Sequence, residues 1–213
     1  MPASPKTSLA PSGTARRRPP RRTQADRATR TRAALVAAAR ELFAEEGFAA
    51  TSRDAIATRA GVTRGALYHH FDSKTALAAA VVAELETELV GRVVSAARDG
   101  DGVRDQLHRG CRAYMDACAD PTVARILVDA PAVLGLAACR ALDADACLPL
   151  LEDTFARAKD EGMEAPGDPE VAAALLLGFL NEAASIIAAT PFNRARREAV
   201  TRTVDAFLTK LFG

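Results

Sequence analysis

TSRDAIATRAGVTRGALYHHFDSK, residues 51–74, decides the fold of this chain. Within it, Ala57, Gly61 and Leu67 have the spacing that a helix-turn-helix requires. Ala57 is small enough for two helices to approach closely, Gly61 can take a positive φ in the turn at no steric cost, and Leu67 points back into the shared core. In this motif the second helix lies in the major groove of DNA and the first crosses the backbone. We therefore predict a DNA-binding motif over residues 51–72.

Capping residues predict where the helices of this stretch begin. Thr51 followed three residues later by Asp54 is a capping-box pattern, which predicts the start of the first helix of the motif. Thr63 is expected to cap the second helix and Ser73 the helix after it. A generic helical hairpin would give some of the same signals, so the motif alone leaves that alternative open.

Apolar periodicity predicts helices along the rest of the chain. Hydrophobic residues make up 49% of the 213 residues and aromatic residues 5%, a composition that favours helices over strands. We expect helices over residues 144–161, 170–189 and 193–212, the first of them ended by Gly162. The 170–189 helix is apolar nearly all round, which predicts burial on most of its sides.

Charge is distributed unevenly. Nine basic residues and one acidic residue precede Ala33, so this segment carries a net charge of +8, and the remainder carries −7 of the overall +1. Residues 1–24 are rich in Pro, Arg, Ser and Thr, which predicts a basic arm that is disordered without a partner. Two interpretations stay open: an arm that follows phosphates or enters the minor groove, and a solvated tail with weak electrostatic effects.

Several classes of protein do not fit the sequence. It contains no uninterrupted apolar segment of membrane-spanning length and no signal-peptide pattern, which favours a cytoplasmic protein without a membrane partner. No Ser/His/Asp, metal-ligand or phosphate-loop arrangement stands out, so we expect neither an enzyme nor a cofactor or metal. The chain has four cysteines: Cys111, Cys118, Cys139 and Cys147. We interpret them first as small buried hydrophobic residues, and a redox-sensing pair is the alternative.

Residues 32–82 resemble the TetR family of transcriptional regulators. The matching positions are Arg32, 39–43, Gly47, Phe48, Thr51, Ser52, Ile56, Ala57, 60–68, His70, Phe71, Ser73, Lys74 and Leu77. The match is dense and ordered, and it covers about a quarter of the chain. It departs in small ways, such as Thr75 where the family often has Glu. Beyond it the chain is similar to the family in length, helicity and helix order.

The resemblance implies an all-α protein of about nine helices. Its N-terminal three-helix helix-turn-helix domain would cover residues 25–73, and a helical ligand-binding and dimerisation domain residues 74–213. The last two helices, about 170–189 and 193–212, would pair with their counterparts in a homodimer that binds a palindromic operator in double-stranded DNA. Most members of the family are repressors that release DNA when a small molecule enters the body. The alternative is a ligand-independent DNA-binding or architectural protein.

Arg64 is the first choice for reading a base, since Arg pairs bidentately with guanine. Exposed side chains at a helix N-terminus suit phosphates, and the resemblance adds phosphate and groove contacts. The expected DNA-binding residues are Thr51, Ser52, Arg53, Thr63, Arg64, Gly65, Ala66, Tyr68, His69 and Lys74.

Ligand contacts are expected from inward-facing residues that carry a polar group or a large apolar side chain. The candidates are His108, Cys111, Tyr114, Met115, Cys118, Phe155, Phe179 and Asn181, with Glu182 a weaker one. Asn181 interrupts the most apolar helix, where a buried amide needs a partner: a ligand, the other subunit or a helix end. Simple core packing is the alternative for Met115 and Phe179.

Overall fold

The computed structural model describes residues 24–163 and 167–211, and all of the regular secondary structure in them is helical. Its nine helices are α1 (Gln24–Glu46), α2 (Arg53–Arg59), α3 (Arg64–His70), α4 (Lys74–Ala97), α5 (Gly102–Cys118), α6 (Pro121–Leu134), α7 (Leu136–Asp160), α8 (Pro169–Ala188) and α9 (Arg194–Leu211). The all-α prediction of about nine helices is confirmed for this part of the chain. The predicted basic arm lies outside the described residues, except that α1 already begins at Gln24.

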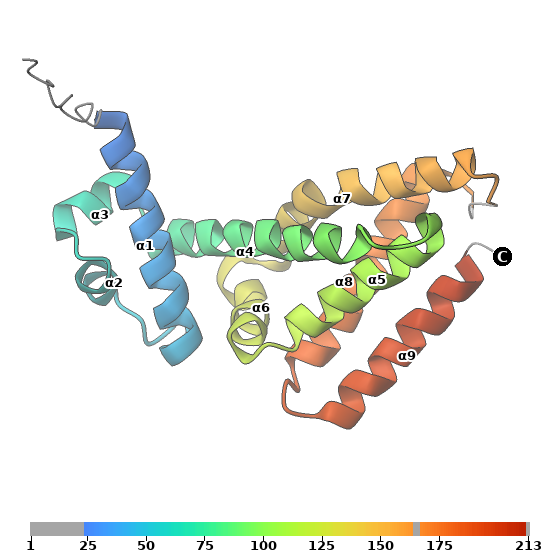
Figure 1. Ribbon diagram of the computed structural model, residues 1–213. Coiled ribbons are helices and arrows are strands. Elements are labelled where there is room, and N and C mark those ends of the chain that lie inside the picture. Colours follow the sequence, from blue (N-terminus) through green and yellow to red (C-terminus); the bar gives the residue numbers. More distant parts are fainter. Residues whose placement is uncertain (1–23, 164–166, 212–213) are drawn as a thin grey trace, which may run out of the picture.

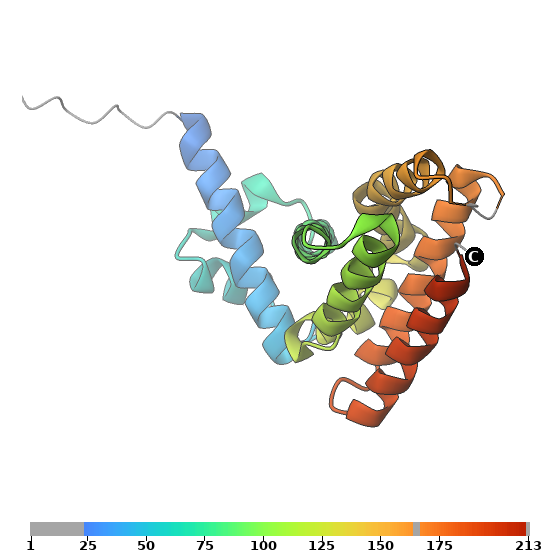
Figure 2. The same cartoon turned by 45° about the vertical axis from the view of Figure 1, so that its right-hand side comes forward.

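The helices form two groups that share α4. Figure 1 shows α1, α2 and α3 at one end of the molecule and α5, α8 and α9 at the other, with the long α4 running between them and α6 near its middle. Turned by 45°, the molecule shows α8 and α9 side by side on the side remote from α1–α3 (Figure 2). One hydrophobic core joins α1–α4 with α6 and the start of α7, and a second joins α5, α7, α8 and α9.

The turn between α2 and α3 has the geometry that its glycine predicts. Gly61 has a φ of +66°. Its amide donates to the Thr58 carbonyl oxygen, and the Val62 amide donates to the Ala57 carbonyl oxygen, at 3.1 and 3.0 Å. These two bonds form a Schellman motif, which satisfies the last carbonyl groups of α2. Leu67 is fully buried, so Ala57, Gly61 and Leu67 take the positions that their spacing predicts.

Two of the three predicted caps are confirmed. The hydroxyl oxygen of Thr63 accepts from the Ala66 amide at the start of α3, and that of Ser73 accepts from the Ala76 amide at the start of α4. The capping box on Thr51 is wrong, because Ser52 caps α2. Thr51 is 1% exposed, and its hydroxyl donates to the carbonyl oxygens of Gly47 and Leu42, at 2.9 and 3.3 Å.

Helix α7 is longer than the sequence predicts, beginning at Leu136 rather than at residue 144. Gly135, with a φ of +84°, separates it from α6. Pro149 lies inside α7 and removes one backbone hydrogen bond. The helix continues nevertheless, since Leu151 and Phe155 on its inner face are buried in the second core.

Helix α8 is apolar on more sides than the rest of its own chain covers. It is the one helix in the described ranges that is long and apolar enough to cross a membrane, and about half of it is buried inside the protein. Its Phe179 ring stacks on Phe207 of α9 with centroids 4.5 Å apart. Val171 and Leu175 of the same helix stay exposed. These exposed side chains form an apolar face beside α9.

Candidate functional site

Helix α3 presents a polar face to solvent while Leu67 anchors it in the core. Arg64, Gly65, Tyr68 and His69 are exposed on that face. The Thr63 hydroxyl oxygen accepts from the Ala66 amide and so fixes the N-terminus of α3, while the residue stays exposed. A short helix held this way offers backbone amides and an arginine at one exposed end, which suits contact with DNA.

Two arginines flank the ring of Tyr68. The Arg53 guanidinium lies over the ring at 4.2 Å from its centroid and donates to the Asp72 carbonyl oxygen at 3.2 Å. Arg64 donates to the Tyr68 hydroxyl at 3.2 Å, and its Nε lies 3.2 Å from an Asp54 carboxylate oxygen. The Tyr68 hydroxyl and the Asp54 carboxylate raise the pKa of Arg64. This cluster sets positive charge beside the N-terminus of α3.

Lys74 begins α4 and is held from three sides. Its ammonium group donates to the carbonyl oxygens of Phe48, Ala49 and Thr51, at 2.7, 3.4 and 3.0 Å. It also lies 4.2 Å from the centroid of the Phe48 ring. Lys74 therefore fastens the start of α4 to the segment between α1 and α2.

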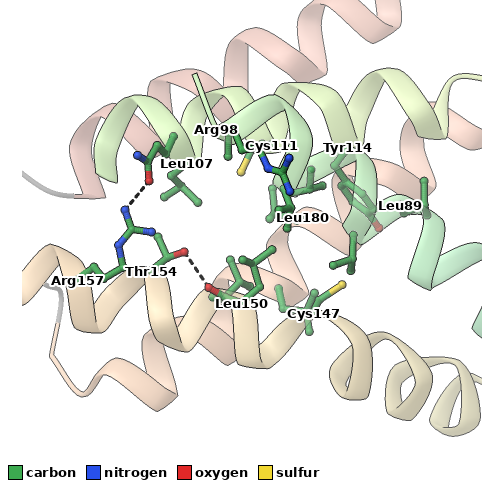
Figure 3. Close-up of a pocket in the computed structure, with 18 residues that line it drawn as sticks. Leu89, Arg98, Leu107, Cys111, Tyr114, Cys147, Leu150, Thr154, Arg157 and Leu180 are labelled. Atoms are coloured by element: carbon green, nitrogen blue, oxygen red, sulfur yellow. Dashed lines mark hydrogen bonds between the residues drawn. The ribbon is translucent and has the colours of Figure 1, made fainter. Parts of the chain in front are cut away.

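A cavity of about 320 Å³ opens between α4, α5, α7 and α8. Its walls are mostly aliphatic, with side chains such as Leu89, Val93, Leu151 and Leu180. Figure 3 shows Arg157 toward one end of this cavity and Leu89 with Tyr114 toward the other. Its size is within the range of pockets that take small molecules, about 300–1,000 Å³.

A second cavity, of about 550 Å³, lies between α4, α6, α7 and α8 and is more polar. Tyr114 lines both cavities. Its hydroxyl donates to the Asn181 side-chain oxygen at 3.2 Å, and the Asn181 amide donates to Asp143 at 3.0 Å. Burial raises the pKa of Glu86 to about 8, with a further contribution from the Asp143 carboxylate, to which it is hydrogen-bonded. Burial also raises the pKa of Asp143.

Two family models match the chain. One, described as bacterial regulatory proteins of the tetR family, matches residues 35–81, and the other, described as a tetracyclin repressor-like C-terminal domain, matches residues 104–211. A TetR-family transcriptional regulator from Pectobacterium atrosepticum has a similar structure, with a TM-score of 0.77 and 35% identity over 90% of this chain and 98% of that one.

The chain belongs to the TetR family of transcriptional regulators.

Two curated relatives match part of the chain. FasR of Mycolicibacterium smegmatis, an HTH-type transcriptional activator, is 39% identical over 85 residues, which are 40% of this chain and 39% of FasR. An HTH-type transcriptional repressor of Mycobacterium tuberculosis is 39% identical over 88 residues, 41% of this chain and 46% of the repressor. The matched segments thus span less than half of these relatives. One of these two relatives is an activator and the other is a repressor, and neither is an enzyme.

In this TetR-family chain, the predicted DNA-binding residues divide into two groups. The first group lies at the surface around α2 and α3. Arg53 and Ala66 of this group are half-buried, and the other six are exposed: Ser52, Thr63, Arg64, Gly65, Tyr68 and His69. Thr51 is buried with its hydroxyl bonded to backbone, so it has no free group for a phosphate. Lys74 already donates to three carbonyl oxygens, which makes it a positioning residue for the domain.

Most of the predicted ligand-binding residues do not line either cavity. Cys111 and Tyr114 line the 320 Å³ cavity, and Tyr114, Asn181 and Glu182 line the second one. Five others are placed away from both cavities. Met115, Cys118 and Phe155 are buried core residues, His108 lies 3.4 Å from Asp205 of α9, and Phe179 stacks on Phe207.

Asn181 has partners that the sequence does not reveal, namely Tyr114 and Asp143 of the same chain. Sequence reasoning also missed Arg98, Arg157 and Glu86. A signal existed for Glu86, because it follows Val82 by four residues on a helix whose core stripe has that same step.

All four cysteines are free thiols. Burial raises the pKa of Cys111, Cys118 and Cys147 to about 12, and that of Cys139 also rises. Because the thiolate is the reactive form, these groups are poor nucleophiles at neutral pH. The geometry therefore favours the small-hydrophobe interpretation over the redox-sensing pair.

Replacing Lys74 with Met is expected to lower the free energy of unfolding by about 1.5–3 kcal/mol, because hydrogen bonds from a charged donor to three carbonyl oxygens are lost while the apolar stem is kept. Urea unfolding followed by circular dichroism measures the change. Lys159→Met, at an exposed position in the last turn of α7, is the matched control and should stay within about 0.5 kcal/mol of wild type. Equal stability of the two variants would remove the anchoring role of Lys74.

Proposed function

We propose that this TetR-family protein is a cytoplasmic homodimeric repressor that binds a palindromic operator and is released by a small molecule. Residues 25–73 serve as the DNA-binding domain, and residues 74–213 bind the effector and form the dimer. Arg64 reads a base, with further contacts from Ser52, Arg53, Thr63, Gly65, Ala66, Tyr68 and His69.

The observation that carries the proposal is the double role of α4. Its first residue, Lys74, is bonded to the segment between α1 and α2, and Glu88 farther along pairs with Arg40 of α1. Its C-terminal part, residues 89–97, forms one wall of the 320 Å³ cavity together with Arg98. A ligand that displaces this part therefore acts on the element that carries the DNA-binding helices. Coupling of about 1–3 kcal/mol would change DNA affinity by about 5- to 150-fold.

The dimer proposal is supported by the apolar face on α8 and α9. Leu175 is 71% exposed, and Val171 and Phe207 are also exposed beside it. Leu, Val and Phe side chains left in water on two adjacent helices suit burial against a second copy of the chain, since a symmetric dimer uses the same face on both subunits. Two subunits joined here present two copies of α3 to one duplex.

Replacing Leu175 with Glu is expected to convert the dimer into a monomer, because two like charges would then meet in an apolar interface. Sedimentation equilibrium gives the mass, and operator affinity should fall by at least about 100-fold as one of two half-site contacts is lost. Val128→Glu is the matched control, since Val128 of α6 is 49% exposed but lies on a different helix. If Leu175→Glu remains dimeric, the interface lies elsewhere.

The whole proposal is tested by selecting bound sequences from random DNA with the purified protein. Footprinting on the selected site should protect two symmetric half-sites, and a metabolite library should contain a compound that releases the DNA. The ligand-independent or architectural alternative predicts uniform coating of DNA and no selected sequence. Mapping the genomic sites and measuring transcription from them decides between repression and activation.

A further inference from the structure

The charge distribution in the 320 Å³ cavity points to one class of effector. Among the described residues that line it, the charged ones are Arg98 and Arg157, and neither Asp nor Glu is present. Gln106 and Thr154 are the neutral polar side chains besides Tyr114 and two thiols, and all other walls are aliphatic or glycine. A cavity of this kind attracts a negative group at one place and an apolar body elsewhere.

Both arginines come from helix C-termini that border the cavity. Arg98 follows the last residue of α4, and Arg157 lies in the last turn of α7. These two helix ends meet the start of α5, where the Val103 amide donates to Glu161 at 3.3 Å and Arg157 donates to Gln106. Leu89 and Cys147 lie about 13–15 Å away along α4 and α7, at 1.5 Å of rise per residue.

Arg98 is available for a ligand. Its side chain is exposed and makes no hydrogen bond or ion pair within the described ranges. Arg157 is held by Gln106 and lies 3.8 Å from Asp153, so its position is fixed while it remains partly exposed. Guanidinium groups bind carboxylate, sulfate and phosphate groups through paired hydrogen bonds.

Away from the two guanidinium groups, the cavity offers no free polar group. The Tyr114 hydroxyl already donates a hydrogen bond to the Asn181 side-chain oxygen. The thiols of Cys111 and Cys147 stay protonated at neutral pH because burial raises the pKa of each to about 12. Leu89, Leu177 and Leu180 add to the apolar lining, which therefore suits a hydrocarbon tail.

We propose that the effector is an amphipathic anion, an unbranched acyl or alkyl chain that fills the apolar length of the cavity and pairs its anionic end with Arg98. This inference rests on the proposed effector role of the cavity. The volume of about 320 Å³ holds roughly ten groups of the size of a water molecule or a methylene, at about 30 Å³ each. The preferred chain is thus of medium length.

Calorimetric titration of the full-length protein without DNA tests whether the cavity binds an anionic chain of medium length. Saturated carboxylates from about six to about fourteen carbons bracket the cavity volume. Affinity should rise about fourfold per methylene and level off near ten carbons. The matched primary alcohols and amines should bind at least about tenfold more weakly, because they lack the negative charge. Decyl sulfate and decyl phosphate, compared with decanoate, distinguish a carboxylate site from one that takes any anionic end.

Three variants locate the binding site. Arg98→Ala should weaken decanoate binding by about tenfold or more and leave decanol binding unchanged. Arg92→Ala, exposed on the same helix and absent from the cavity lining, should change neither. Val90→Trp fills the apolar part and should shift the preferred chain to a shorter one, and it also supplies a fluorophore to a chain that has no Trp.

Equal binding of decanoate and decanol, or no effect of Arg98→Ala, would overturn the proposal. The proposal would also be overturned if no anionic chain bound the protein while another compound released operator DNA. In that case the proposed regulatory function stands without this effector class. Conversely, chain-length-dependent binding that leaves operator affinity unchanged would support the anionic effector site and contradict release by ligand.

Discussion

Replacing Arg64 with Ala is expected to abolish sequence-specific DNA binding and leave the fold and the proposed dimer intact. The Arg64 side chain is 67% exposed at the start of α3, so truncation removes no core contact. A bidentate pair between arginine and guanine is worth about 1–3 kcal/mol of discrimination. A symmetric dimer loses two such pairs, so operator affinity should fall by about 30-fold to more than about 10,000-fold.

The contacts of Arg64 in the free protein sharpen this expectation. Its guanidinium rests against the Asp54 carboxylate and the Tyr68 hydroxyl, both at 3.2 Å. These exposed contacts are weak, so the side chain can exchange them for a base edge. Fluorescence anisotropy with operator and random duplexes of one length measures the loss. Arg59→Ala is the matched control, because Arg59 is an exposed arginine of α2 that faces Glu41 and Glu45 of α1.

The comparison of the two duplexes separates the possible roles of Arg64. A loss confined to the operator supports base reading. An equal loss on both duplexes makes Arg64 a phosphate contact, since phosphate contacts carry no sequence information. Unchanged operator affinity contradicts any direct role.

The DNA-binding motif was predictable because its signals are local. The positive φ of Gly61 and the caps at Thr63 and Ser73 each depend on residues within a few positions of one another. The residue types of Thr51 and Lys74 suit phosphates, which predicts DNA contacts from the sequence alone. Their actual partners are carbonyl oxygens between Leu42 and Thr51, some of them more than twenty residues from Lys74. No local pattern encodes that proximity.

The cavity was less predictable because its walls come from four helices. Helical periodicity correctly brought Cys111 and Tyr114 to an inward face of α5. Periodicity does not say whether an inward residue meets a cavity or a neighbouring side chain, and Met115 and Phe155 meet the core. Arg98 and Arg157 are exposed residues at helix ends, where arginine is common. Only the packing of α4 against α7 places them beside the same cavity.

Stability is expected to decline as the pH rises from about 5 to about 8, because Glu86 is buried. Burial and the Asp143 carboxylate raise its pKa from 4.5 to about 8. Between these values the folded protein keeps a proton on Glu86 that the unfolded chain has lost. Each such proton lowers the free energy of unfolding by about 1.4 kcal/mol per pH unit, so the total loss is at most about 5 kcal/mol. The raised pKa of Asp143 acts in the same direction.

Glu86→Gln is expected to flatten this profile. Its amide can donate to Asp143 as the protonated carboxyl does, and it needs no proton uptake on folding. Near pH 4.5 the variant and wild type should have similar free energies of unfolding, and at pH 8 the variant should be more stable by a few kcal/mol, about 3–5 by the same linkage. Urea unfolding at several pH values measures both. Glu84→Gln, an exposed position on the same helix, is the matched control and should follow wild type.

The shape of the difference identifies the responsible group. If Glu86→Gln loses stability with pH in parallel with wild type, Glu86 is ionised in the folded protein, and solvent or a counter-charge reaches it in the second cavity. If the slope falls by about half, Asp143 carries the remainder, since the two carboxyls titrate as a pair. Asp143→Asn in the Glu86→Gln background should then remove the rest. Because both side chains line the second cavity, the same profiles report whether that cavity excludes water from its acidic wall.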